Sequence, residues 1–380
     1  MNTNKFQTGR VSLVAFSHFV HDVYTSFLAP LLPVIIEKLS LTLSQAGLLS
    51  TVMQIPALLN PVIGLFADNK SLARWMVVLS PTLTAIPMSF ILSVSSYPLM
   101  LLFFFLAGIS VALYHVPSPV LIAKYSGPKK GQGMSFFMTG GEAARTIGPM
   151  VAVAAVSILG IDHFYAVLIF AVMTSVLLYF TLEKETETIR IKKHGSLAAS
   201  YREIRHVLKP ITGILAARAF MHAAMGVFLT VYVEKKTGSL WLGGAALALY
   251  EAFGVLGVLC GGTLSDRIGR KQVLFSVLAL APAAILLFTF SSGLIQVVSL
   301  MVVGFTVLST TPVMLAVIQE NADQNPSAAN GLFMMTSFAV RSIAVFLAGI
   351  IGDALGLDMM FILSAAIGCC AIPFLLKMKC

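Results

Sequence analysis

Twelve long apolar runs dominate this chain. Each can supply the ~20 residues that a helix needs to cross the ~30 Å hydrocarbon core of a bilayer. With 58% hydrophobic and 11% charged residues, the composition excludes an ordinary soluble domain. We therefore expect an all-α membrane protein with twelve transmembrane helices. The runs begin near Val11, Ser44, Trp75, Pro98, Gly133, Asp162, Pro210, Leu240, Val273, Ile295, Ala328 and Asp358.

The basic residues are distributed unevenly between the loops. If the N-terminus is cytoplasmic, 19 of the 25 Lys and Arg lie in internal loops and tails, and only Lys38, Lys235 and Lys236 lie outside. This asymmetry follows the positive-inside rule and predicts that both termini are cytoplasmic. The net charge of +9 then reflects membrane topology, and no nucleic-acid partner is expected.

Sequence signals for enzymes are absent. The chain has no G-x-x-x-x-G-K-[ST], G-x-S-x-G or H-E-x-x-H motif, and no extramembrane segment large enough for a catalytic domain. The four cysteines show no C-x-x-C spacing, so neither a disulfide framework nor a zinc site is indicated. We expect neither an enzyme nor an ATP-driven pump, with no cofactor and no resident metal.

One long polar segment divides the chain into halves. It predicts a six-helix bundle over residues 1–182, a cytoplasmic linker over 183–209 and a second six-helix bundle over 210–380. The halves resemble each other: "GLFADNK" at Gly64–Lys70 is echoed by "GTLSDRI" at Gly262–Ile268. Such repeats are typical of secondary transporters, whose substrate site lies between the halves near the bilayer midplane.

The second copy of this repeat continues as "GTLSDRIGRK". It fits G-x-L-[AS]-D-R-x-G-R-[KR], and here the chain resembles the major facilitator superfamily. The resemblance implies two pseudo-symmetric bundles that rock against each other, with an inner-side latch that must break during the motion. An ordinary cytoplasmic turn carrying topological charges is the alternative. The latch candidates are Gly262, Asp266, Arg267, Gly269 and Arg270, with Asp68 in the degraded first copy.

Four further segments are similar to the fosmidomycin-resistance branch of that superfamily. They are "HFVHD", "YHVPSP", "GGEAARTIGP" and the pair Gln319-Glu320. This resemblance implies an efflux carrier of the cytoplasmic (inner) membrane that exchanges protons for a small, often anionic compound. The chain departs from the branch pattern at Val116 and Ser118, and where Glu142 and Arg145 replace neutral residues.

Ten ionisable side chains fall within the predicted spans. Each buried charge costs at least ~2.5–3.5 kcal/mol on insertion scales, so we expect these groups to face a cavity or one another. They are His18, His21, Asp22, His115, Glu142, Arg145, Arg218, His222, Glu251 and Arg341.

The spacing of the charges suggests specific chemistry. His18 and Asp22 are four residues apart and share a helix face, with His21 close to it, so they can hold a proton near neutral pH. A purely structural histidine–aspartate lock is the alternative. Glu142 and Arg145 can form a static ion pair, or protonation of Glu142 can release Arg145 to bind an anionic substrate.

The remaining candidates surround these groups. Arginine forks suit carboxylate or phosphonate groups, and His115 precedes two prolines that should interrupt its helix. Helix packing is the alternative for the tyrosines, and pairing with Arg341 is the alternative for Glu251. The proton-coupling candidates are Asp22, His18, Glu142 and Glu251; the substrate-binding candidates are Arg145, Arg218, His115, His21, His222, Arg341, Tyr114 and Tyr250.

Together these features predict a monomeric, proton-coupled secondary transporter that moves a small organic anion or drug by alternating access. Uptake by symport would use the same residues. A metal-ion or nutrient carrier that uses the intramembrane His/Asp cluster is one alternative, although three intramembrane arginines would repel a cation. A transporter-like sensor is another.

Overall fold

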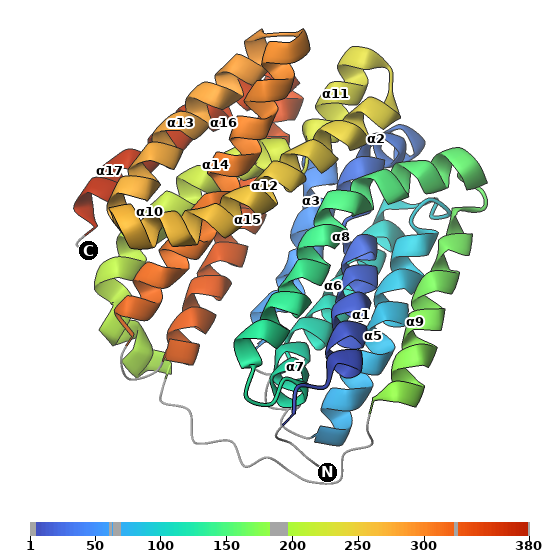
Figure 1. The fold of residues 1–380 in the computed structure, drawn as a ribbon. Helices are drawn as coiled ribbons and strands as arrows, with labels where there is room; N and C mark the ends of the chain where they lie inside the picture. Colours follow the sequence, from blue (N-terminus) through green and yellow to red (C-terminus); the bar gives the residue numbers. More distant parts are fainter. Residues whose placement is uncertain (1–4, 61–62, 64–69, 183–196, 323–325, 379–380) are drawn as a thin grey trace. The chain divides into compact units, whose positions relative to one another are not determined.

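The computed structural model describes residues 5–60, 63, 70–182, 197–322 and 326–378, and among these it contains helices and turns but no strand. The chain divides into two compact units (Figure 1). Unit 1 comprises Met1–Ser40 and Val52–Ile191, and unit 2 comprises Leu41–Thr51 and Lys192–Cys380. The expected all-α class is confirmed.

Unit 1 is built from long helices joined by short turns. Its elements are α1 (Thr8–Thr25), α2 (Leu28–Leu39), η1 (Ile55–Leu59), α5 (Lys70–Phe90), α6 (Tyr97–His115), α7 (Ser118–Tyr125), α8 (Lys130–Leu159), η2 (Phe164–Val167) and α9 (Leu168–Thr181).

Unit 2 repeats this pattern. Helix α3 (Leu43–Gln54) starts within its range, and the other elements are α10 (Leu197–Gly226), α11 (Leu229–Thr237), α12 (Leu240–Ile268), α13 (Arg270–Phe290), α14 (Gly293–Glu320), α15 (Pro326–Leu355), α16 (Leu357–Cys369) and α17 (Ala371–Lys377).

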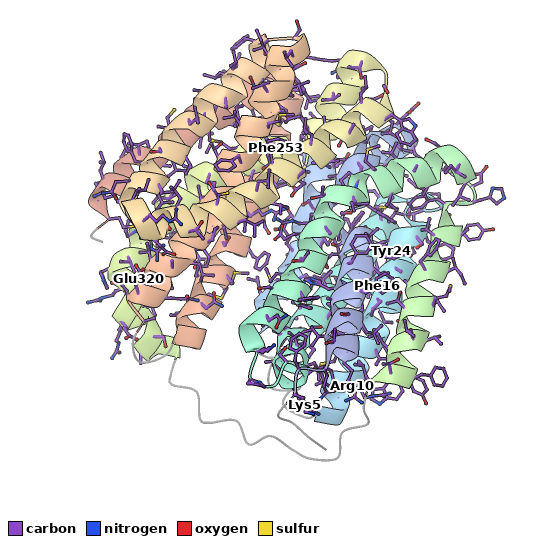
Figure 2. All side chains as sticks on the ribbon, viewed as in Figure 1. Lys5, Arg10, Phe16, Tyr24, Phe253 and Glu320 are labelled. Atoms are coloured by element: carbon purple, nitrogen blue, oxygen red, sulfur yellow. The ribbon has the colours of Figure 1, made fainter. Side chains whose placement is uncertain are left out.

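All twelve predicted spans are helical. Ten segments of the described chain are long and apolar enough to cross a membrane. The remaining two are the shorter apolar segment Leu43–Leu59 and α5. Large apolar side chains such as Phe16, which is 50% exposed, cover the outer surfaces of the helices (Figure 2). This exposure suits contact with lipid, and the protein is a multi-pass membrane protein.

Two spans of unit 1 are interrupted where proline requires it. Pro30 cannot donate a hydrogen bond to the carbonyl of Ser26, and the first span breaks there into α1 and α2. Pro119 likewise cannot bond to the carbonyl of His115, where α6 ends before α7 begins at Ser118. The second break leaves His115 at a helix end.

Glycines allow close helix contact in both units. A methyl group at Gly140 of α8 would overlap the carbonyl oxygen of Ala15 on α1. In unit 2, a methyl group at Gly257 of α12 would overlap the carbonyl of Phe305, and one at Gly304 of α14 would overlap that of Tyr250. Small residues of this kind let helix backbones approach within a membrane.

The boundaries of the units depend on contacts that the sequence pattern does not show. Helix α10 begins at Leu197 and continues through Pro210, so the part of the expected linker after residue 196 is helical; residues 183–196 lie outside the described chain. The start of α3 belongs to unit 2, where the Asp353 carboxylate accepts hydrogen bonds from the amides of Leu43 and Ser44 at 2.5 and 2.8 Å.

Candidate functional site

Helix α1 brings three ionisable side chains into the interior of unit 1. His21 is fully buried and His18 is 4% exposed, while the Asp22 side chain is 13% exposed. The i, i+4 spacing places His18 and Asp22 on one face, and Nε2 of His18 lies 3.2 Å from Oδ2 of Asp22. The predicted histidine–aspartate contact therefore forms.

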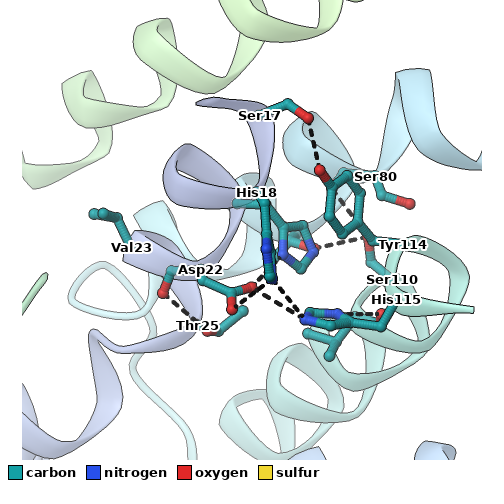
Figure 3. A network of polar contacts seen from close by, with 12 residues as sticks. Ser17, His18, Asp22, Val23, Thr25, Ser80, Ser110, Tyr114 and His115 are labelled. Atoms are coloured by element: carbon teal, nitrogen blue, oxygen red, sulfur yellow. Dashed lines mark hydrogen bonds and ion pairs between the residues drawn. The ribbon is translucent and has the colours of Figure 1, made fainter. Parts of the chain in front are cut away.

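A third histidine reaches this group from another helix. His115 lies at the end of α6, and its Nε2 is 3.5 Å from Oδ1 of Asp22 and 3.2 Å from Nε2 of His18 (Figure 3). Nδ1 of His21 is 2.8 Å from Oδ1 of Asp22. We call His18, His21, Asp22 and His115 the histidine–aspartate cluster.

Backbone carbonyls determine how two of these imidazoles are oriented. Nδ1 of His18 lies 2.7 Å from the carbonyl oxygen of Phe137, and Nδ1 of His115 lies 3.0 Å from that of Val111. A carbonyl only accepts hydrogen bonds, so both Nδ1 atoms must carry the donating hydrogen. The His18 ring also stacks on Phe137 with centroids 3.9 Å apart. Both rings consequently direct Nε2 toward Asp22.

His21 is held by a different set of contacts. Its Nε2 lies 3.0 Å from the Thr84 hydroxyl, which donates to Ser110 at 2.8 Å, and Ser110 donates to the carbonyl oxygen of Ser80 at 3.1 Å. The ring stacks on Tyr114 with centroids 4.4 Å apart. These contacts join α1 to α5 and α6 around the cluster.

Tyr114 supports the cluster from the side. It is fully buried, and its hydroxyl is 2.6 Å from the Ser17 hydroxyl. Its position on the His21 ring indicates that it orients the imidazole.

A glycine of α8 covers the cluster. A methyl group at Gly141 would lie 2.6 Å from Cε1 and 2.9 Å from Nε2 of His18, and 3.2 Å from Oδ2 of Asp22. Contacts below 3.0 Å require the neighbours to move. Gly141 therefore makes room for the cluster.

The expected ion pair of α8 is present. Nη2 of Arg145 donates to Oε2 of Glu142 at 2.6 Å, and the two side chains are 42% and 18% exposed. The pair immediately follows Gly141. Helix α8 therefore contributes both the glycine that packs against the cluster and a partly exposed guanidinium.

The cluster also has the spacing of a possible metal site. Single ligand atoms of His18, Asp22 and His115 lie within 4.8 Å of one another. Two imidazoles and a carboxylate suit several divalent ions. A proton between Nε2 of His18 and Nε2 of His115 would also give these side chains a hydrogen bond.

Two site candidates of unit 2 contact neighbouring helices of their own bundle. Nδ1 of His222 lies 3.2 Å from the Tyr250 hydroxyl, which connects α10 to α12. Nε of Arg218 donates to the carbonyl oxygen of Val307 on α14 at 2.8 Å. Glu251 follows Tyr250 on α12, and Arg341 lies midway along α15.

The residues of the predicted latch meet within unit 2. Arg270 pairs with Asp266 at 2.5 Å and with Glu320 at 2.8 Å, so two separate sequence motifs converge on one guanidinium. Gly269 has φ +100°, which favours glycine between α12 and α13. Arg267 is exposed. Gly262 lies in the last turns of α12, and Asp68 lies outside the described residues.

Sequence reasoning missed the neutral residues of the site. Thr84, Ser110 and Ser17 are ordinary hydroxyl residues in apolar runs, and the Phe137 carbonyl has no sequence signal at all. The glycines Gly140, Gly141 and Gly148 were the available indication that another helix approaches α1.

Comparison with known proteins gives the family. The model of the Major Facilitator Superfamily matches residues 14–345. The chain is 23% identical over 371 residues to the fosmidomycin resistance protein of Escherichia coli K12, covering 95% of this chain and 91% of the relative. It is also 23% identical over 358 residues to the uncharacterized MFS-type transporter YfnC of Bacillus subtilis 168, covering 91% and 87%.

Solved structures show the same fold. A bacterial homologue of the human lysosomal transporter Spinster, in an inward-facing and occupied conformation, has a TM-score of 0.86 at 13% identity, covering 98% of this chain and 96% of that one. The nucleoside transporter NupG has a TM-score of 0.78 at 14% identity and full coverage of both chains. These proteins are transporters, not enzymes. The helical units and the match over residues 14–345 together show that this chain belongs to the Major Facilitator Superfamily.

Proposed function

We propose that this transporter is a proton-coupled exporter of a small organic anion or drug in the inner membrane, with both termini cytoplasmic. The observation that carries the proposal is the contact of the Asp22 carboxylate with three imidazoles at 2.8–3.5 Å inside a membrane-spanning bundle. Carboxylate and imidazole are the side-chain groups that most readily exchange protons near neutral pH when brought together.

A change in protonation of this cluster has consequences for conformation. Gain or loss of one proton changes the net charge of the cluster by one, and an uncompensated charge within the bilayer costs at least ~2.5–3.5 kcal/mol. A difference of this size favours one conformation over another by roughly a hundredfold. Proton binding at Asp22 and its neighbours can therefore drive alternating access.

The preference for an anion is supported by Arg145. Its side chain is 42% exposed although it lies within a span, and its Nη2 is bound to Glu142. Protonation of Glu142 would weaken its ion pair with Arg145, whose guanidinium fork suits carboxylate or phosphonate oxygens through two parallel hydrogen bonds. The relationship to a fosmidomycin resistance protein supports the same class of substrate and the outward direction.

Transport by purified protein in liposomes tests the proposal. Radiolabelled fosmidomycin should accumulate against its gradient when a pH gradient is imposed, and collapse of that gradient by an ionophore should abolish accumulation. Asp22→Asn should retain binding but lose uphill transport. Uphill transport by Asp22→Asn at the wild-type level would contradict the role of Asp22.

The anion preference requires a separate comparison. Arg145→Ala should weaken binding of fosmidomycin much more than binding of its neutral ester. Arg202→Ala, a change of an exposed arginine in α10, serves as the matched control and should affect neither. Equal losses for acid and ester would contradict a direct contact between Arg145 and the anion.

The spacing of His18, Asp22 and His115 also favours a second candidate, a carrier of divalent metal ions. The same liposomes distinguish the two functions. Uptake of radioactive zinc that depends on Asp22, without movement of fosmidomycin, would replace the anion proposal with the metal one.

A further inference from the structure

The hydrogen-bond pattern of the histidine–aspartate cluster restricts where protons can be. We propose that the exchanged proton is carried between Nε2 of His18 and Nε2 of His115, with the Asp22 carboxylate as its counter-charge. This inference rests on the proposed proton coupling and names the side chains that carry the proton.

The two Nε2 atoms need a proton because of how their rings are held. Both rings commit Nδ1–H to a backbone carbonyl, His18 to Phe137 and His115 to Val111. In the neutral rings both Nε2 atoms are then lone-pair acceptors, and they lie 3.2 Å apart. One added proton converts this repulsive contact into an N–H···N hydrogen bond. The resulting imidazolium lies 3.2–3.5 Å from Asp22 oxygens.

A second hydrogen of the cluster lies between His21 and Asp22. Ser110 donates to the Ser80 carbonyl, so Thr84 must donate to Ser110. Nδ1 of His21 lies 2.8 Å from Oδ1 of Asp22, and because the ionised carboxylate only accepts, Nδ1 carries the hydrogen of this contact.

The exposure of the side chains differs between His21 and the His18–His115 pair. His21 is fully buried, and its hydrogen-bond chain ends at the Ser80 carbonyl, which cannot pass a proton onward. The side chain of His115 is 36% exposed, compared with 5% for His18 and 13% for Asp22. His115 is therefore the most exposed of these side chains, and in this proposal the exchanged proton enters through it. A free imidazole also binds a proton more tightly than a free carboxylate.

The other ionisable groups around the pair are already engaged. From α1 the pair faces Asp22 and His21, and from α6 it faces the phenol of Tyr114, which is bound to Ser17. Helix α8 contributes the Phe137 carbonyl and Gly141, followed by the mutually paired Glu142 and Arg145. Helix α5 contributes the neutral Thr84 hydroxyl. Asp22 is thus the only acid of the described chain in contact with the pair.

Loss of the proton has a structural effect. It leaves three acceptor groups facing one another at 3.2–3.5 Å, and this contact is repulsive. His115 is the ring able to move away, because α6 ends at this residue and Pro117 follows. The protonated pair holds α1 to α6, and deprotonation releases that connection.

Spectroscopy without any substrate tests the inference independently of transport. The protein is labelled with ¹⁵N-histidine, placed in lipid nanodiscs and titrated by NMR. At high pH both His18 and His115 should show Nδ1–H with a bare Nε2. On acidification the two signals should change together as one proton is taken up. Infrared difference spectra should show no new protonated carboxyl band from Asp22.

Two variants compare a histidine of the pair with a histidine outside the cluster. His115→Asn should abolish the coupled change of the His18 signal and reduce proton uptake through this transition by one per protein. His163→Asn, a change of an exposed histidine outside the cluster, should remove one independent signal and leave the coupled transition intact.

Several results would overturn the proposal. They are Nε2–H tautomers at high pH, an unchanged His18 transition in His115→Asn, or an acid-induced carboxyl band that Asp22→Asn removes. The infrared and tautomer results on wild-type protein decide the question even if the variants do not fold. Proton-coupled transport together with an Asp22 carboxyl band would leave the proposed function intact and reject the histidine pair.

Discussion

Replacing Gly141 with alanine should place a methyl group directly against the histidine–aspartate cluster. The new Cβ would lie 2.6 Å from Cε1 and 2.9 Å from Nε2 of His18, well inside normal contact distance. The ring cannot yield freely because it is stacked on Phe137 and bonded to its carbonyl at 2.7 Å. His18 must therefore shift and weaken its contacts with Phe137, His115 or Asp22.

The expected cost follows from these contacts. Crowding of a packed interior costs ~1–3 kcal/mol, and loss of a hydrogen bond to a charged group adds ~1.5–3 kcal/mol. Exchange of glycine for alanine in a helix gains at most ~1 kcal/mol. We expect a net destabilisation of about 3 kcal/mol in unit 1, together with loss of the proposed pH-driven transport.

Tryptophan fluorescence can measure the destabilisation of unit 1 separately from unit 2. The chain has two tryptophans, Trp75 in unit 1 and the exposed Trp241 in unit 2. In a Trp241→Phe background, denaturant unfolding in mixed micelles reports on Trp75 alone. Gly9→Ala on α1 is the matched control, since a methyl group there would meet nothing within 4 Å. The steric reasoning would be refuted if Gly141→Ala were as stable as Gly9→Ala and transported at the wild-type rate.

Two further changes probe the ends of the bundles. Arg74→Lys should destabilise unit 1 by ~1–3 kcal/mol. Arg74 is 5% exposed and donates to the carbonyls of Leu182 and Tyr179, and lysine cannot reproduce this fork. The Trp75 fluorescence assay measures this loss of stability, and an unchanged unfolding midpoint would contradict the prediction. Arg270→Ala should change stability by less than ~1 kcal/mol, because its partners Asp266 and Glu320 are more than half exposed, yet it should slow transport of whichever substrate the liposome assay identifies. A normal transport rate would remove the case for a latch.

Several features of this protein could be predicted from sequence because they depend on local rules. The apolar runs specify membrane-spanning helices, since an unpaired backbone group in lipid is too costly. The prolines after His115 predicted an interruption of its helix, because proline lacks the amide hydrogen, and α6 ends at that residue. The contacts of His18 with Asp22 and of Glu142 with Arg145 follow from helical periodicity.

Other features depend on which helices are neighbours. The sequence analysis gave His115 as a substrate-binding candidate, because nothing in its own span connects it with Asp22. Its Nε2 nevertheless lies 3.5 Å from that carboxylate, across 93 residues of chain. Glu320 and Arg270 likewise belong to motifs that sequence alone could not join.

By itself, the sequence determined that this protein spans the membrane many times and which charges share a helix face, because both follow from the backbone within a few residues. The tertiary structure alone decided the composition of the cluster: His115 from α6, the carbonyl of Phe137 and the space at Gly141 from α8, and the hydroxyl of Thr84 from α5. Hydrogen-bond donors and acceptors act only within about 3 Å. Which atoms come that close depends on how separate helices pack, and packing is a property of the whole bundle.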